Sequence, residues 1–198
     1  MENYLTRRLV SEEIIAANAV IDALMLSAKN VRNSTIFLIN NIITAYEYNT
    51  STKLFDLKKD LHSHQIENLA LINKIIPLYN THASSKKLKP GQKVKTLNLY
   101  TEHITSITRN QILNHKLIEQ TLKSAEALKI QSLRAYANTH SYIAQYTLQK
   151  TVDDFKHWFK ALTAYYKNKE AFTGRPEMPF YKQKNDRSTI ELNISRLS

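Results

Sequence analysis

The chain has 198 residues, of which 42% are hydrophobic, so it can fill the core of one domain or two small ones, and disorder is excluded for most of it. Its formal charge of +11 favours a polyanionic partner, with nucleic acid as the first expectation. Because cysteine is absent, disulfides, thiol nucleophiles and cysteine-bound zinc are excluded.

The first 46 residues predict one strand and two helices. Residues 4–10 are short and β-capable, and they end at Ser11, a good N-cap residue. Two runs of apolar residues at helical spacing follow, the first from Ile14 to Ala28 and the second from Ile36 to Tyr46. We therefore expect two packed helices after the strand.

Further helical patterns follow in the middle of the chain. Polar and turn-prone residues break the pattern over 49–60, and an amphipathic helix is then predicted from Ile66 to Ile76. Residues 97–127 are helical in composition, with a break expected near Asn110. A long helix is predicted over 139–166, with one face that steps by four or three residues and is expected to be buried. That face carries Leu148, Val152, Phe155, Phe159, Leu162 and Tyr166.

A basic loop is predicted at residues 84–95. This segment surrounds Pro90 and Gly91 with lysines and has no acidic residue, which is typical of an exposed connection. Two interpretations stay open: a solvated linker, or a loop that contacts phosphate groups through its lysines.

The C-terminal segment leaves helical periodicity at residues 174–179. Its two prolines remove amide donors and force extended backbone on the residues before them, so the long helix ends there. Residues 188–195 alternate apolar and polar side chains, as in a half-buried strand. The predicted fold is thus mainly α: a helical domain at 11–172, with a small β element formed by the N-terminal segment 1–10 and the C-terminal segment 173–198.

Two segments of the chain resemble a known family. The motif F-K-H-W-F-K-A-L at 155–162 leads to G-R-P-E-M-P-F-Y-K-Q-K at 174–184. In order, spacing and residue type, this closely resembles the OrfB/TnpB family of insertion-sequence proteins, in which a helix F-K-x-[FW]-F-K-A-L precedes a G-[KR]-P-x-[LMF]-P-x-[YF]-K-x-K turn and a strand. A weaker similarity lies at 28–33, where A-K-N-V-R-N stands in place of the family's A-K-N-L-Y-N. Residues 50–130 add nothing to the resemblance.

The resemblance implies a transposon-encoded, RNA-guided protein, distantly related to the type V CRISPR effectors. In such proteins the N-terminal and C-terminal segments, here 1–10 and 173–198, contribute to a β-barrel wedge domain, and the helices between them form a recognition lobe against the guide–target duplex. The RuvC-like nuclease and the zinc ribbon of the family lie downstream. We therefore expect the front half of such a protein, as a fragment or the product of a truncated gene, which binds guide RNA and DNA without cutting.

The candidate nucleic-acid-binding residues follow from this frame. Cations on the extended backbone around the prolines can reach phosphates, and an aromatic side chain there can stack on a base or ribose. The alternative for the cations is a solvated charge run after a turn. The candidates are Arg175, Tyr181, Lys182, Lys184 and Arg187, together with Lys86, Lys87 and Lys89 of the basic loop.

Catalytic, metal and cofactor sites are not predicted. The pair His62 and His64, and the helical set Asp153, Asp154 and His157, lack a further convergent ligand. No phosphate-cradling glycine loop, nucleophile elbow or zinc-protease motif occurs. No stretch approaches the roughly 18 apolar residues of a spanning helix, and no secretion signal follows Met1, so we expect a cytoplasmic protein that does not span a membrane.

Two further functions stay open at this level. One is a cleavage-incompetent regulator, in which guided binding blocks transcription without cutting. The other is a helical interaction module whose positive charge serves solubility or docking to an acidic protein.

Overall fold

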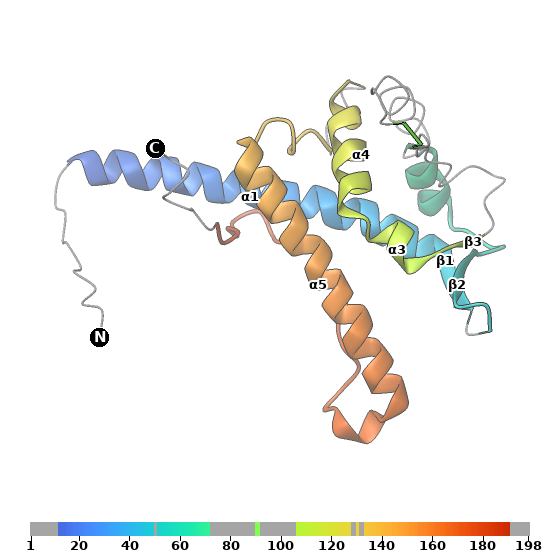
Figure 1. Cartoon of the computed structure of the whole chain (residues 1–198). Coiled ribbons are helices and arrows are strands. Elements are labelled where there is room, and N and C mark those ends of the chain that lie inside the picture. The colour runs from blue at the N-terminus through green and yellow to red at the C-terminus, as the bar shows by residue number, and fades with distance from the viewer. Residues whose placement is uncertain are drawn as a thin grey trace.

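Two long helices form the framework of the protein. The structure, a computed structural model, describes residues 12–49, 51–71, 90–91, 106–127, 130 and 133–190. Over these residues the fold is mainly α with a small antiparallel sheet, as predicted. Helices α1 (Glu12–Ala45) and α5 (Ser141–Lys167) pack against each other and cross, as Figure 1 shows.

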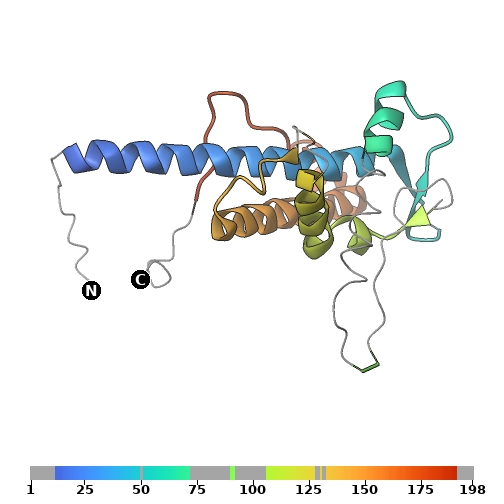
Figure 2. The ribbon, with the colours of Figure 1, turned by 90° about the horizontal axis from the view of Figure 1, so that it is seen from above.

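Helix α1 is one continuous helix, so the prediction of two packed helices in this region was wrong. Its sequence contains neither glycine nor proline, and the polar stretch at 29–35 does not interrupt it. Within that stretch the hydroxyl of Thr35 donates to the carbonyl of Val31 at 2.9 Å, which lets a buried polar side chain stay inside the helix. Figure 2 shows α1 as an uninterrupted rod.

The core lies where α1 and α5 cross. Val31 and Ile39 of α1, and Val152 and Phe155 of α5, have no exposed surface. The predicted buried face of α5 is confirmed as far as Phe159. It is wrong at Tyr166, which is 58% exposed, because α5 continues beyond the body of the protein (Figure 1).

The sheet has the order β1-β2-β3 and is antiparallel throughout. Strands β1 (Tyr46–Asn49) and β2 (Leu54–Leu57) form a hairpin directly after α1, and β3 (Ser106–Ile107) pairs with β2. The side chain of Asn49 closes the turn by accepting from the amides of Ser51 and Thr52 at 3.0 and 3.2 Å. We had predicted only a polar break here, and the predicted strand at 4–10 lies outside the described residues.

The shorter helices pack against α1. Residues 63–71 are helical, and α3 (Arg109–Ile112) begins with a capping box between Thr108 and Gln111. Helix α4 (His115–Ala127) follows after a break at residues 113–114, close to the break predicted near Asn110.

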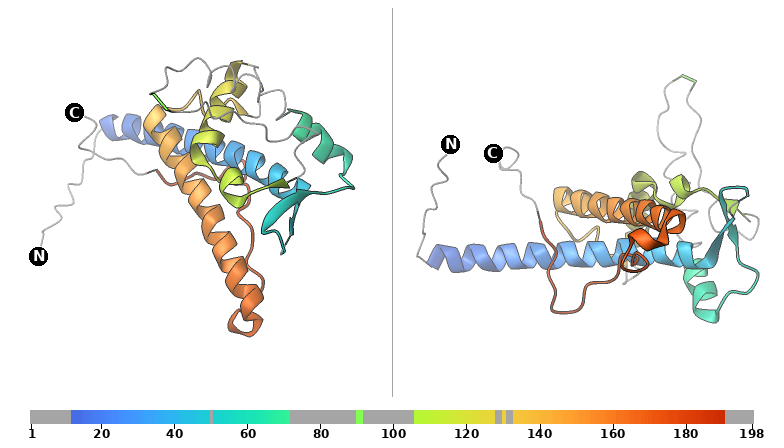
Figure 3. Two further views of the ribbon diagram at one scale, coloured as in Figure 1. Left: turned by 45° about the vertical axis from the view of Figure 1, so that its right-hand side comes forward. Right: turned by 90° about the horizontal axis from the view of Figure 1, so that it is seen from below.

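The chain then turns back from the far end of α5. After the short 3₁₀ helix η2 (Lys169–Ala171), residues 175–183 have no regular secondary structure, and the helical pattern does not resume there, as the two prolines predict. The chain returns to α1 and runs beside it, as the two views in Figure 3 show. Of the strand predicted at 188–195, residues 188–190 have no regular secondary structure and the others lie outside the described residues.

Candidate nucleic-acid interface

Residues 175–188, which we call the return segment, carry five of the eight predicted binding residues. The indole Nε1 of Trp158 donates to the carbonyl of Pro176 at 3.1 Å and joins the start of this segment to α5. At its other end the amide of Ser188 donates to the carbonyl of Met25 at 3.3 Å. The return segment therefore spans from α5 to the N-terminal half of α1 (Figure 3).

Asn33 of α1 fixes the middle of the return segment. Its Nδ2 donates to the carbonyl of Lys182 at 2.9 Å, and its Oδ1 accepts from the amide of Lys182 at 2.9 Å. The side-chain amide of Asn33 thus makes the two hydrogen bonds that a neighbouring strand would make, and it satisfies both the amide and the carbonyl of Lys182. This contact joins residues 28–33, where the resemblance to the family is weaker, to the motif at 174–184.

Lys29 secures the next residues. Its ammonium group is almost fully buried, with 5% of the residue exposed, and it donates to the carbonyls of Lys184 at 2.8 Å and Gln183 at 3.4 Å. A buried cation needs such acceptors, because burial without them is strongly unfavourable. Lys29 therefore holds the backbone of the return segment and is not itself presented to a ligand.

Because the backbone carries these contacts, several side chains of the return segment point to solvent. Arg175 and Lys184 are exposed, Tyr181 is 45% exposed and Phe180 is 71% exposed. Cationic side chains contact phosphates and aromatic rings stack on bases, so these exposed residues are of the types that a nucleic-acid interface uses. The structure thus brings these predicted residues onto one exposed segment.

Two other predicted cations are engaged within the protein. The ammonium of Lys182 donates to the carbonyl of Arg187 at 2.6 Å. The guanidinium of Arg187 forms a two-pronged ion pair with Asp22, with Nε–Oδ1 at 2.7 Å and Nη2–Oδ2 at 2.9 Å. The hydrogen bond from Arg187 holds the pKa of the Asp22 carboxyl below its ordinary value. Arg187 is therefore paired to an acid rather than presented as a free cation, and the loop lysines Lys86, Lys87 and Lys89 lie outside the described residues.

Tyr181 also borders a polar groove. This groove has a volume of about 450 Å³ and lies between α1 and the turn at 133–139 that precedes α5. Its walls include Asn30 and Phe37 of α1, and Arg134 and Asn138 of the turn. Amide, guanidinium and aromatic groups together match the hydrogen-bonding edge and the flat face of a nucleobase.

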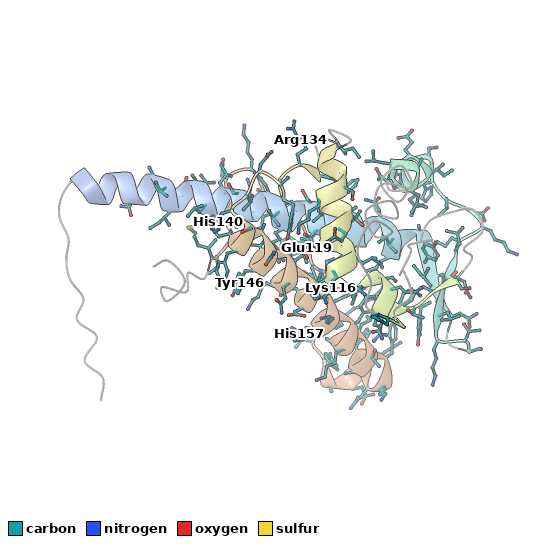
Figure 4. All side chains as sticks on the ribbon, turned by 45° about the horizontal axis from the view of Figure 1, so that its top comes forward. Lys116, Glu119, Arg134, His140, Tyr146 and His157 are labelled. Atoms are coloured by element: carbon teal, nitrogen blue, oxygen red, sulfur yellow. The ribbon has the colours of Figure 1, made fainter. Side chains whose placement is uncertain are left out.

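A polar cluster centred on Glu119 connects α4 to α5. Its Oε1 accepts from Lys123 at 2.7 Å, from Tyr136 Oη in the turn before α5 at 2.8 Å and from Gln145 of α5 at 3.5 Å; Figure 4 labels Glu119 on α4. Burial raises the pKa of Glu119, but the hydrogen bonds from Lys123 and Tyr136, together with nearby positive charge, lower it by more. The pKa therefore lies below its ordinary value. Burial, and then the bond to Glu119, raise the pKa of Tyr136. A carboxylate held ionised by its donors stabilises the helix junction and lacks the raised pKa of a general acid.

The residues considered for metal binding are used otherwise. His62 and His64 stack on each other with ring centroids 5.7 Å apart. Asp153 pairs with Lys156 at 2.8 Å, and Asp154 pairs with Arg32 at 2.6 Å. Among the residues that the structure describes, no group of three or more His, Asp or Glu side chains is placed to hold a metal ion.

The sequence did not identify Lys29 and Asn33 as the groups that position the interface. Their only signal was the weaker similarity at 28–33, which gave no indication that these side chains bind backbone carbonyls and an amide of residues 182–184. Arg32 and Asp154 were missed in the same way, because their ion pair joins residues far apart in the chain.

Comparison with known proteins adds no relative. No protein family, no curated protein and no solved structure matches the chain. In the part of the chain that is described, no helix combines the length and the apolar character that crossing a membrane requires.

Proposed function

We propose that the chain is a nucleic-acid-binding portion of a transposon-associated, OrfB/TnpB-like protein that binds guide RNA and DNA. The formal charge of +11 and the motifs at 155–162 and 174–184 support this proposal. So does the contact between segments 28–33 and 174–184, because the weaker similarity and the motif at 174–184 lie side by side in the fold.

The observation that carries the proposal is that the backbone of the return segment is bound to α1 while several of its side chains remain exposed. Its backbone is held by Asn33 and Lys29, while Arg175, Tyr181 and Lys184 are directed outward. A rigid backbone with outward cations and an aromatic ring loses little side-chain and main-chain freedom when it binds phosphates and bases.

Binding to structured RNA at increasing salt tests the proposal. The affinity of the purified protein for an RNA from the end of a transposon is measured by filter binding between 50 and 300 mM salt. We expect a steep fall with salt, because each phosphate contact releases counterions. The double variant R175Q/K184Q is expected to lower the slope of log K against log salt by about 0.7 per lost contact.

The matched control is K53Q, which removes one exposed lysine from the hairpin turn, far along the chain from the return segment. It should bind as the wild type does. Absence of binding, or binding that salt leaves unchanged, would exclude the proposed function.

The helical interaction module is a second candidate, and one observation favours it. Val20 and Ile21 are 60% and 41% exposed on the part of α1 that projects beyond the rest of the protein (Figure 2). Apolar side chains on a projecting helix are typical of a protein contact. This candidate predicts no retention on RNA at moderate salt, so the same filter-binding experiment separates the two functions.

A further inference from the structure

A second hollow lies between α1, α5 and the return segment. Its volume is about 340 Å³, at the lower end of the range for small-ligand sites, which suits a small group rather than a large molecule. Tyr146, labelled on α5 in Figure 4, forms part of its wall. The wall also includes Arg32, Thr147, Lys150, Asp154, Lys182 and Ser188.

Cations outnumber acids in this hollow. Arg32, Lys150 and Lys182 face the single carboxylate of Asp154, which holds Arg32 Nη1 at 2.6 Å. Lys182 uses one donor on the carbonyl of Arg187, and an ammonium group has three. Lys150 is exposed at the rim. The hollow therefore keeps a positive charge after its internal pairs are formed.

Residues that line the hollow also carry buried polar atoms that lack a partner. Arg32 Nε, Thr147 Oγ1 and Ser188 Oγ are buried and have no hydrogen-bond partner among the described residues. Thr147 and Ser188 are only 5% and 4% exposed. Buried donors without acceptors are unfavourable, and three of them around one hollow indicate an occupant that accepts hydrogen bonds.

We propose that this hollow binds a phosphate group. Arg32, Lys150 and Lys182 supply the positive charge, and the hydroxyls of Thr147 and Ser188 turn to donate to the phosphate oxygens. A phosphate offers several acceptor oxygens in a tetrahedral arrangement, which matches donors that come from three separate elements. Asp154 acts as a positioning residue, because it fixes the guanidinium of Arg32 through Nη1 and leaves Nε for the ligand.

Two sources supply this chemistry. One is a backbone phosphate of the bound nucleic acid, and in that case the inference rests on the proposed function. The other is free phosphate or the phosphate of a mononucleotide, and in that case it does not. The experiment therefore has one arm for each source.

In the first arm, thermal unfolding is followed in inorganic phosphate and in chloride at equal pH and ionic strength. A saturable rise of Tm in phosphate is expected for the wild type, since a ligand that binds only the folded state stabilises it. The double variant T147V/S188A should unfold in chloride at or above the wild-type temperature, because it removes unpaired hydroxyls. It should lose the rise in phosphate.

In the second arm, K150Q is compared with K116Q in the RNA filter-binding experiment. Both lysines are exposed, but Lys116 lies on α4 and outside the hollow (Figure 4). K150Q is expected to lower the slope of log K against log salt by about 0.7, the value for one lost phosphate contact, while K116Q leaves it unchanged.

A response of the hollow variants in either arm supports the phosphate site and identifies its source. Phosphate stabilisation without RNA binding would support the site while the proposed function fails. RNA binding that T147V/S188A and K150Q leave at the wild-type level, together with no effect of free phosphate, would overturn the site while the proposed function stands.

Discussion

The helix crossing and the return segment are held in place by different kinds of contact. At the crossing, α1 and α5 bury apolar side chains completely, among them Ile39 and Phe155. The return segment has its contacts with α1 mainly through polar side chains, which bind its backbone at Lys182 and Lys184. One region derives its stability from removing apolar surface from water, and the other from satisfying backbone donors and acceptors.

The difference shows how a binding surface can be both fixed and available. A segment packed through its own side chains would have none left for a ligand. In the return segment the contacts go to the backbone, so that Arg175 and Tyr181 stay at the surface. Changes at the crossing should therefore affect folding, and changes at the return segment should mainly affect binding.

The largest expected effect is that of F155A. Phe155 has no exposed surface and contacts Trp158 edge to face, with ring centroids 6.4 Å apart. Truncation removes buried apolar surface and leaves a cavity, so the free energy of unfolding should fall by about 3–5 kcal/mol. Denaturant unfolding followed by circular dichroism measures this fall.

The matched control is Y166A on the same helix. Tyr166 is 58% exposed, and its removal should change the free energy of unfolding by less than about 0.5 kcal/mol. Equal losses in the two variants would contradict the placement of the core at the crossing.

The second prediction concerns a polar contact inside the helical body. Tyr136 is 4% exposed and donates to the ionised Glu119. Y136F should lower the free energy of unfolding by about 2 kcal/mol, as expected for a buried hydrogen bond to a charged group. Urea unfolding at pH 7 measures the loss, and a variant as stable as the wild type would contradict this contact.

The same pair predicts the pH dependence of stability. The pKa of Glu119 is lowered below its ordinary 4.5 in the folded protein. Its contribution to the free energy of unfolding is therefore complete above pH 4.5 and is lost as the pH falls through the folded pKa. The pKa of Tyr136 is raised above its ordinary 10.0, so its contribution is present below pH 10 and is lost as pH rises toward the folded pKa. In Y136F the free energy of unfolding, measured by urea unfolding at each pH, should fall less above pH 10 than it does in the wild type.

The helical content and the end of α5 could be predicted because they depend on local sequence. The apolar spacing of residues 148–159 defined a buried face, and the prolines at 176 and 179 ended the helical pattern. The break before α4 was also predicted, close to where it occurs.

Features that depend on distant partners were not predicted. Strand β2 pairs with β3 across about fifty residues, and neither short strand has a clear alternating pattern of its own. Periodicity gave the face of α5 but not the point at which α5 extends beyond its crossing with α1, so Tyr166 was wrongly expected in the core. For the same reason the sequence indicated which cations are on the return segment but not that Arg187 is paired with Asp22.

The smallest effect on folding is expected from N33L, although this variant tests the return segment most directly. Leucine has the same number and branching of side-chain heavy atoms as asparagine but cannot bond to the amide and carbonyl of Lys182. The free energy of unfolding should fall by only about 1 kcal/mol, because the freed backbone groups reach water when the segment lifts from α1. Amide hydrogen exchange at Lys182 should accelerate far more than exchange in α5, and RNA affinity should fall although Arg175 and Lys184 are unchanged. If exchange at Lys182 stayed slow, Asn33 would not be what fixes the return segment, and the separation between a folding region and a binding region would be lost.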